Sequence, residues 1–525
     1  MTTRQIIKQL LERAIKKNYG KKVKAGVEKP QNFFFGDYAT NVAMMLKQDP
    51  NKIALFLKSP LFEKVETKRG FINFFLSKEY LQKKVGQILK QGERFGDLKI
   101  GRGERVNVEF VSANPTGPLT LGNGRGGFCG DCLANILERS GFKVTREYYI
   151  NDRGKQVVQL GHSVIGDEES VYKGNYIEEL KGKMKGVLVK GPILVKVPAQ
   201  KYADRVGEKA ANIILKEMIK PAVKKMGIKF DTWFSEKSLY KKGEIKKTLS
   251  LLRKKKLIYE KEGAFWFKSI PFGDDKDRVL IKEDGEETYF LSDIAYLTDK
   301  INRGFKKIIF FLGADHSGYV QRIKAIAKAL GFPVENIDII IMQLVKLFEK
   351  GKEVRMSKRA GIYLTIEELI DEVGLDVARF FFLQRSPDSH LNFDLDLARK
   401  QSAKNPVYYI QYAHARICSI LRKSPKYKIQ DKGYKTLSHP SELNLIRQLI
   451  RLPEVIEDTV KDRQVQRIPQ YALDLATTFH QFYRDCKVIS DNNQSTKERL
   501  ALVLAAKIIL KNTLSLMGIS TPEKM

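Results

Sequence analysis

The sequence predicts an α/β fold in which a parallel sheet stands between a small α+β domain and an all-helical domain. A strand pattern, a helical pattern and a second strand pattern follow one another between residues 106 and 150, which is a βαβ unit. Residues 306–312 are almost continuously apolar, as expected for a strand covered on both faces of a parallel sheet. Beyond about residue 401 only helical periodicity recurs. These three observations define the fold class.

Composition limits the classes of protein to consider. The 525 residues suffice for three or four domains, and 43% hydrophobic residues support full cores. There is no signal-peptide pattern and no apolar run long enough to cross a bilayer, so we expect a cytoplasmic protein without a membrane partner. Four cysteines fit a reducing compartment. Cys129 and Cys132 form one C-x-x-C without a second pair, which favours helix packing over a metal or redox site.

The chain is strongly basic. Its net charge is +33, from 94 Lys and Arg against 61 Asp and Glu. This surplus favours a polyanionic partner, because each phosphate that a cation neutralises releases bound counterions. A lysine-rich composition can also be a general bias, and basic runs such as residues 253–256 are typical of solvated surfaces. Charge therefore indicates a nucleic-acid partner without proving one.

Residues 1–100 have the pattern of a small α+β domain. An amphipathic helix begins near Ile6, and an aromatic segment at residues 33–41 precedes a strand at residues 70–76. Its phenylalanines fit a packed core. Asn73 differs from them, because an amide inside an apolar strand needs hydrogen-bond partners.

The loop of the βαβ unit, within residues 109–125, is the first candidate site. It lies where a strand ends and a helix begins, which is where open α/β sheets bind ligands. Free N–H groups and the helix dipole there favour a phosphate. Gly122 and Gly124 permit close approach of a ligand to the backbone. Glu109 lies in the apolar strand before the loop, so we expect it to have a cationic partner.

Further along the chain the sheet pattern is interrupted and then resumes. The pattern becomes irregular in residues 152–240, with mixed helices and short strands, and we interpret this segment as an insertion. Another strand at 337–344 precedes a basic, glycine-flanked loop at 350–361. In the helical region, aromatic and basic residues from 408 to 416 suit stacking on unpaired bases or a plain helical core.

Three loops carry a resemblance to a known family. They read Asn-Pro-Thr-Gly-Pro-Leu-x-x-Gly-x-Gly-Arg from residue 114, Gly-Ala-Asp-His from 313 and Arg-Met-Ser-Lys-Arg from 355. This set resembles the class I aminoacyl-tRNA synthetases, and specifically arginyl-tRNA synthetase. Further segments with the same resemblance lie in order at residues 36–41, 70–75, 147–152, 272–278, 289–296, 405–416 and 517–525.

The resemblance implies a fold and a reaction. It implies a Rossmann-type parallel-sheet catalytic domain at 101–400 with the insertion at about 152–240, an N-terminal domain at 1–100 that binds the tRNA body, and a helical anticodon-binding domain at 401–525. L-arginine and ATP would form arginyl-adenylate and pyrophosphate, and the arginyl group would pass to the 3′-terminal adenosine of tRNA(Arg), releasing AMP. Positioning and neutralised phosphate charge would suffice for catalysis. Mg²⁺ would arrive with ATP, no protein-bound metal is predicted, and we expect a monomer.

The resemblance also implies roles for individual residues. Asp293 would supply the planar acceptor that distinguishes arginine from lysine. The catalytic group is Lys358, Ser357, Arg355, Thr120 and Asn123, and the ATP-binding group is Pro118, Gly122, Gly124, Arg125, Gln343, Met356 and Lys358. The arginine-binding group is Glu109, Asn114, Tyr289, Asp293, His316 and Tyr319, and the tRNA-binding group is Phe71, Asn73, Tyr408, Tyr412 and Arg416.

One departure from the family pattern leaves alternatives open. The family signature His-x-Gly-His is replaced by Thr120-Leu-Gly-Asn123, whose side chains donate hydrogen bonds but carry no charge. A tRNA-binding paralogue with weak or no catalysis is therefore the alternative. A dinucleotide-binding dehydrogenase is a third possibility, since glycines stand at 122, 124 and 127. Pro115 and Pro118 make the loop too long for that motif.

Overall fold

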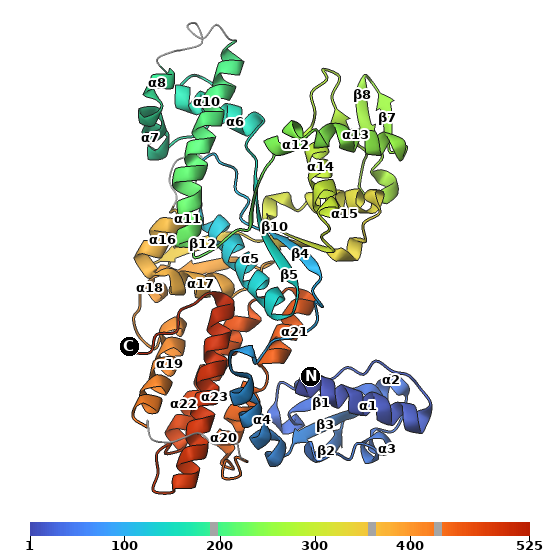
Figure 1. Cartoon of the computed structure of the whole chain (residues 1–525), viewed down its shortest axis with the longest axis vertical. Helices are drawn as coiled ribbons and strands as arrows, with labels where there is room; N and C mark the ends of the chain where they lie inside the picture. The colour runs from blue at the N-terminus through green and yellow to red at the C-terminus, as the bar shows by residue number, and fades with distance from the viewer. Residues whose placement is uncertain (189–197, 355–363, 425–432) are drawn as a thin grey trace.

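A computed structural model describes residues 1–188, 198–354, 364–424 and 433–525 (Figure 1). The central sheet lies at mid-height in Figure 1, and the C-terminal helices extend below it. The N-terminal part lies beside those helices at the lower end. Two excursions from the sheet project at the opposite end, one around α10 and one around β7 and β8.

The N-terminal part is a three-stranded antiparallel sheet with helices. Helix α1 begins after a capping box in which Thr2 and Gln5 satisfy each other's backbone N–H groups, and it ends at Gly20 in the left-handed conformation. The sheet order is β1-β3-β2. The elements are α1 (Thr3–Tyr19), β1 (Tyr38–Thr40), α2 (Val42–Leu46), α3 (Pro50–Leu55), β2 (Phe62–Lys68), β3 (Phe71–Leu76) and α4 (Lys78–Gln91). Helix α4 packs against the C-terminal helices α20 and α23.

The central sheet is parallel and five-stranded, in the order β11-β10-β4-β5-β6. On β10, Ile308 and Phe310 join one hydrophobic core while Ile309 and Phe311 join the other. The predicted strand is therefore covered on both faces. The strands are β4 (Arg105–Glu109), β5 (Lys143–Ile150), β6 (Thr232–Ser235), β10 (Lys307–Gly313) and β11 (Ile337–Met342), and the helices around them are α5 (Leu121–Arg139), α14 (Tyr289–Asn302) and α15 (Tyr319–Leu330).

Two excursions interrupt the sheet between β5 and β10. Strand β6 lies between them and pairs with β5, so the segment 152–240 that we expected to be an insertion contributes an edge strand. The first excursion holds α6 (Lys155–Ile165), α7 (Asn175–Lys183), α8 (Lys185–Leu188), α10 (Ala199–Ile214), a π-helical turn (Leu215–Ile219) and α11 (Lys220–Lys225). The second holds α12 (Lys237–Lys241), α13 (Glu244–Lys254) and the antiparallel strands β7 (Ile258–Lys261), β8 (Ala264–Phe267) and β9 (Arg278–Ile281).

A small sheet and a helical bundle complete the chain. Helix α23 is long and apolar enough to cross a membrane, but 72% of its most apolar stretch is buried inside the protein. The small sheet holds β12 (Val345–Glu349), β13 (Lys352–Val354) and β14 (Leu391–Asp394), next to α16 (Ile366–Val373), α17 (Leu375–Leu383) and α18 (Leu395–Ala398). The bundle is α19 (Pro406–Arg422), α20 (Pro440–Leu449), α21 (Leu452–Asp462), α22 (Arg467–Asp485) and α23 (Asn493–Met517).

Candidate active site

Two buried carboxylates lie side by side at the carboxyl ends of neighbouring strands. Glu109 ends β4, and the parallel register places it opposite Glu147 on β5. Glu109 is 6% exposed and Glu147 is fully buried. Two adjacent buried negative charges are costly unless cations neutralise them.

Helix α14 supplies the neutralising charge. Lys300 Nζ lies 2.9 Å from Glu109 Oε2 and 2.8 Å from Glu147 Oε1. Arg303 Nη1 lies 2.5 Å from Glu147 Oε2. Burial opposes ionisation of Glu147, but the two cations outweigh it and lower the pKa of Glu147 to about 2. The cationic partner expected for Glu109 is thus Lys300.

The same helix carries the side chains that are candidates for binding the substrate. Tyr289, Asp293, Tyr296 and Lys300 recur at intervals of four, three and four residues, which places them along one face of α14. No side-chain hydrogen bond or ion pair joins Asp293 to another described residue. Burial, followed by the charges of Glu236 and Glu109, raises the pKa of Asp293 to about 8. The Tyr289 hydroxyl accepts a hydrogen bond from the Lys155 backbone N–H at 2.9 Å.

Glu236 is a further site residue that sequence reasoning missed. It directly follows β6, is 2% exposed, and lies near enough to Asp293 for each carboxylate to oppose the ionisation of the other. Burial raises the pKa of Glu236. Its signal is the one that marks Glu109, an acidic residue at the carboxyl end of a parallel strand. The sequence pattern of residues 152–240 indicates only mixed helices and short strands, so it does not mark Glu236 as the end of a parallel strand.

The loop after β4 is strained. Val111 and Ser112 have φ angles of 65° and 38°, a region that β-branched residues rarely adopt. The Ser112 hydroxyl donates to Glu109 Oε1 at 3.3 Å and accepts from the Tyr149 backbone N–H at 3.1 Å. Asn114 Nδ2 donates to Gln156 Oε1 at 2.5 Å. The turn therefore positions Asn114 and Glu109 on one short loop.

Thr120 and Asn123, which replace the signature histidines, contact each other. Asn123 Oδ1 accepts from the Thr120 backbone N–H at 3.0 Å and from its hydroxyl at 2.9 Å, in a capping box that begins α5. A Cβ on Gly122 would meet only Thr120 Oγ1, at 3.8 Å, whereas one on Gly124 would lie 2.5 Å from the Ile366 side chain. Gly122 is the glycine with room for a ligand, and Gly124 lets α16 pack closely on α5. Pro118 is half-buried in the same loop.

Arg125 is fully buried and faces protein carbonyl groups. Its Nη1 donates to the Gln343 carbonyl and its Nη2 to the Ser386 carbonyl, each at 2.8 Å. It therefore connects the start of α5 to the loops after β11 and α17. Half-buried Gln343 contributes its backbone to this contact.

The remaining predicted active-site residues lie after β10 or outside the described residues. The rings of His316 and Tyr319 lie 5.2 Å apart, and the Arg322 guanidinium lies 4.8 Å from the Tyr319 ring. Arg322 also favours ionisation of Asp293, so this group borders the same pocket. Arg355, Met356, Ser357 and Lys358 lie outside the described residues.

The residues expected to contact tRNA line two separate cavities. Phe71, 42% exposed, and Asn73, 3% exposed, line a cavity of about 430 Å³ with Lys68 and Arg69. Tyr412 and Arg416 line a second cavity, of about 800 Å³, in the helical part. There the Arg416 guanidinium lies 4.8 Å from the Tyr412 ring and 5.0 Å from the Tyr483 ring. Tyr408 packs on the helical core.

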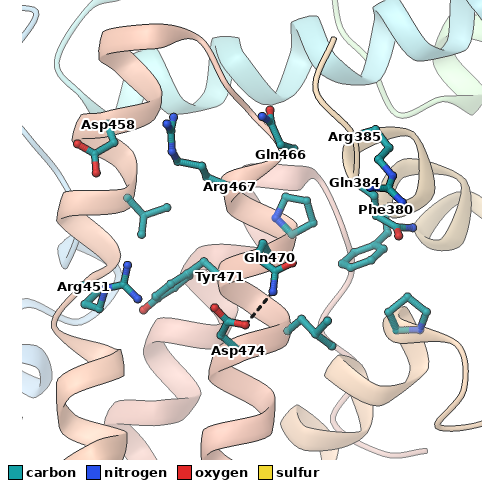
Figure 2. Close-up of a pocket in the computed structure, with 14 residues that line it drawn as sticks. Phe380, Gln384, Arg385, Arg451, Asp458, Gln466, Arg467, Gln470, Tyr471 and Asp474 are labelled. Carbon is teal, nitrogen blue, oxygen red and sulfur yellow. Dashed lines mark hydrogen bonds between the residues drawn. The ribbon is translucent and has the colours of Figure 1, made fainter. Parts of the chain in front are cut away.

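A third cavity, of about 580 Å³, lies between the end of α17 and helices α21 and α22 (Figure 2). Asp458 is paired with Arg4, and Arg467 with Asp462. Arg451 makes no ion pair with a described residue. Burial, followed by the charge of Arg451, lowers the pKa of Lys29, which lines the Phe71 cavity. Arg451 of this cavity and Lys29 of the Phe71 cavity are therefore close enough for their like charges to repel.

Three family models together match most of the chain. They are the arginyl tRNA synthetase N terminal domain at residues 2–76, the tRNA synthetases class I (R) catalytic domain at 84–396, and the DALR anticodon binding domain at 410–525. The fold is thus that of a class I aminoacyl-tRNA synthetase.

Curated relatives identify the particular family. The arginine–tRNA ligases of Geobacillus kaustophilus and Bacillus subtilis are 44% and 43% identical, each over 95% of this chain and 94% of the relative. The arginyl-tRNA synthetase structure of Thermus thermophilus has the same fold, with a TM-score of 0.80 and 22% identity over all of both chains. The chain belongs to the arginyl-tRNA synthetase family. It is an arginine–tRNA ligase that uses ATP, and nothing in these comparisons supports the paralogue without catalysis.

Proposed function

We propose that the pocket between α14 and the carboxyl ends of β4, β5 and β6 binds the L-arginine that the ligase activates. Asp293 and Glu236 receive the guanidinium group, with Tyr289 beside them, and Glu109 receives the α-amino group. The observation that supports this assignment is Asp293, a carboxyl group without a side-chain partner among the described residues. Burial and the charges of Glu236 and Glu109 raise its pKa to about 8, and Arg322 offsets this only in part. Bound arginine supplies a further cation.

Asn114 completes the amino-acid site in this proposal. Its amide donates a hydrogen bond to the arginine carboxylate and holds the attacking oxygen on the β4 side of the pocket. His316 and Tyr319 close the pocket after β10. Holding the reacting atoms in place accounts for much of the catalysis expected, because no covalent enzyme intermediate forms.

ATP lies across the start of α5. The arginine carboxylate attacks the α-phosphorus of ATP and pyrophosphate leaves, which gives arginyl-adenylate. The Pro118–Gly122 loop approaches the nucleotide, whereas Gly124 supports it only by letting α16 pack on α5. Thr120 and Asn123 offer uncharged hydrogen-bonding groups where the family has histidines. Arg355 and Lys358 supply the charge that neutralises the phosphates in this proposal, and Met356 and Ser357 belong to the same motif. Arg125 and Gln343 act as positioning residues, since Arg125 is fully buried against carbonyl groups.

The metal belongs to the nucleotide in this proposal. The described residues contain no group of three or more His, Cys, Asp or Glu arranged to hold a metal ion. In this proposal Mg²⁺ arrives bound to the phosphate oxygens of ATP.

The second step uses tRNA(Arg). A ribose hydroxyl of its terminal adenosine attacks the arginyl carbonyl, and AMP leaves. We assign the outer corner of the tRNA to the cavity of Phe71 and Asn73, and the anticodon to the cavity of Tyr412 and Arg416, with Tyr408 supporting it. Exposed rings beside cations suit unpaired bases. The enzyme acts as a cytoplasmic monomer in this proposal, with domain limits near residues 100 and 400.

Arginine-dependent exchange between ATP and pyrophosphate, measured with and without tRNA(Arg), tests the assignment. We expect exchange that requires L-arginine and is not supported by L-lysine. Absence of exchange under both conditions, with tRNA still bound, would contradict the proposed active site.

A further inference from the structure

The ammonium group of Lys300 is surrounded by three protein oxygens. It donates hydrogen bonds to Glu147 Oε1 at 2.8 Å and to Asn107 Oδ1, and it forms an ion pair with Glu109 Oε2 at 2.9 Å. These contacts direct its positive charge to the protein's own acceptors. Lys300 is fully buried. It therefore acts on the site through Glu109 rather than by touching substrate.

The two oxygens of Glu109 are occupied unequally. Oε2 contacts Lys300 and also the Tyr296 hydroxyl, at 2.7 Å. Oε1 receives only the long hydrogen bond of 3.3 Å from Ser112 among the described residues. A carboxylate accepts about four hydrogen bonds, so Oε1 keeps free capacity. One oxygen is fixed to the protein, and the other is available to a cationic group.

Glu147 explains why Lys300 does not simply neutralise Glu109. Arg303 lies 2.5 Å from Glu147 Oε2, so Glu147 shares its charge between two cations. Arg303 also pairs with Asp299, from Nε to Oδ2 at 2.7 Å, so two basic and three acidic side chains meet here and no excess positive charge lies beside Glu109. An uncompensated lysine would instead repel the substrate ammonium group.

We infer that Lys300 is a positioning residue for arginine recognition, which fixes Glu109 through Oε2 so that Oε1 receives the α-amino group of the substrate. The inference rests on the proposed function, in which Glu109 binds that amino group. Tyr296 shares the task, because its hydroxyl spans Glu109 Oε2 and Glu147 Oε1 at 2.7 and 2.6 Å. Lys300 thus contributes to recognition of the α-amino group of the substrate.

The test compares ligands that keep or lose the α-amino group. Lys300→Met removes the charge and retains an unbranched side chain. We expect the KM for L-arginine in aminoacylation and the Ki of agmatine, which keeps the amine, to rise roughly 10- to 100-fold. The Ki of the 2-hydroxy analogue of arginine, which lacks the amine, should change less than about threefold, and kcat should stay within about threefold. Lys307→Met is the matched control, because Lys307 donates to Asn336 at 3.2 Å on the same sheet and away from the pocket.

Two further variants keep the inference testable. Adding Lys300→Met to Glu109→Gln should cause no further loss of L-arginine binding, because the group that Lys300 fixes is already changed. Tyr296→Phe keeps all charges and should weaken the binding of the same ligands by a smaller factor. If Lys300→Met does not fold, Tyr296→Phe tests the inference in its place. The inference is overturned if the variant binds all three ligands more weakly by the same factor, or if it binds none of them more weakly. A wild-type enzyme that fails to charge tRNA with arginine contradicts the proposed function instead.

Discussion

The proposed arginine site and the two cavities proposed to face tRNA use charge in opposite ways. Around Glu109 and Glu147 the charges are buried, paired at 2.5–2.9 Å and balanced by two cations from one helix. Around Phe71 and around Tyr412, exposed rings lie beside basic side chains. A small cation is distinguished by a few fixed carboxylates, whereas a polyanion is held by many weak contacts that salt screens.

Asp293→Asn should have the largest effect. It keeps the shape of the side chain but removes the charge offered to the guanidinium group, so kcat/KM for L-arginine should fall roughly 100- to 1,000-fold. Affinity for tRNA and its salt dependence should not change. Steady-state aminoacylation and filter binding measure the two quantities, with Asp284→Asn in the exposed turn before α14 as control. A fall of less than about threefold would remove Asp293 from the pocket.

Arginine binding should depend on pH. Asp293 has a raised pKa of about 8, so it is protonated in the empty site at neutral pH and must lose that proton to pair with arginine. Affinity should therefore increase roughly tenfold per pH unit below about pH 8 and level off above it. Calorimetry in two buffers of different ionisation enthalpy should detect release of about one proton. Asp293→Asn should abolish both effects, and a flat pH profile in the wild type would argue against a protonated Asp293.

Phe71→Ala should weaken tRNA binding. Stacking of one base on an aromatic ring contributes about 1–3 kcal/mol, so the Kd should rise roughly 5- to 100-fold. The KM for arginine at saturating tRNA should stay constant, unlike in the pocket variants. Phe34→Ala serves as control, since Phe34 is 83% exposed and does not line the cavity. Equal losses in both variants would point to general destabilisation of this part.

Arg416→Gln should have the smallest effect. Losing one phosphate contact should weaken tRNA binding only a few-fold and reduce the slope of log K against log salt by about 0.7–0.9. Arg484→Gln is the control, because exposed Arg484 already pairs with Asp485 at 2.9 Å. An unchanged slope in Arg416→Gln would indicate that Arg416 orders the rings of Tyr412 and Tyr483 instead.

Much of the fold could be predicted because its signals are local. The near-continuous apolar run of β10 and the helical periodicity after residue 401 follow from which faces must be buried, and both are confirmed. Strand β6 is only four residues long, and its pattern could not be separated from the helices around it. Because the sequence does not predict β6, it does not predict Glu236 as a site residue at the end of that strand either.

The motifs identified the family, but they could not show how site residues pair. Thr120 and Asn123 are three residues apart, and their capping box is a local arrangement that the sequence permits. Arg125 binds carbonyl groups 218 and 261 residues away, so only the folded chain shows what it holds. The individual site roles stay predictions until the variants are measured.

The sequence by itself determined the family, the reaction and the order of the parts, because these depend on short motifs and on hydrophobic periodicity. It also predicted that Glu109 needs a cation, because a buried charge requires one. Only the tertiary structure decided that the cation is Lys300, 191 residues further along the chain and shared with Glu147. Parallel strands bring together residues that are distant in sequence, so the charge balance of the pocket exists only once α14 packs on the sheet.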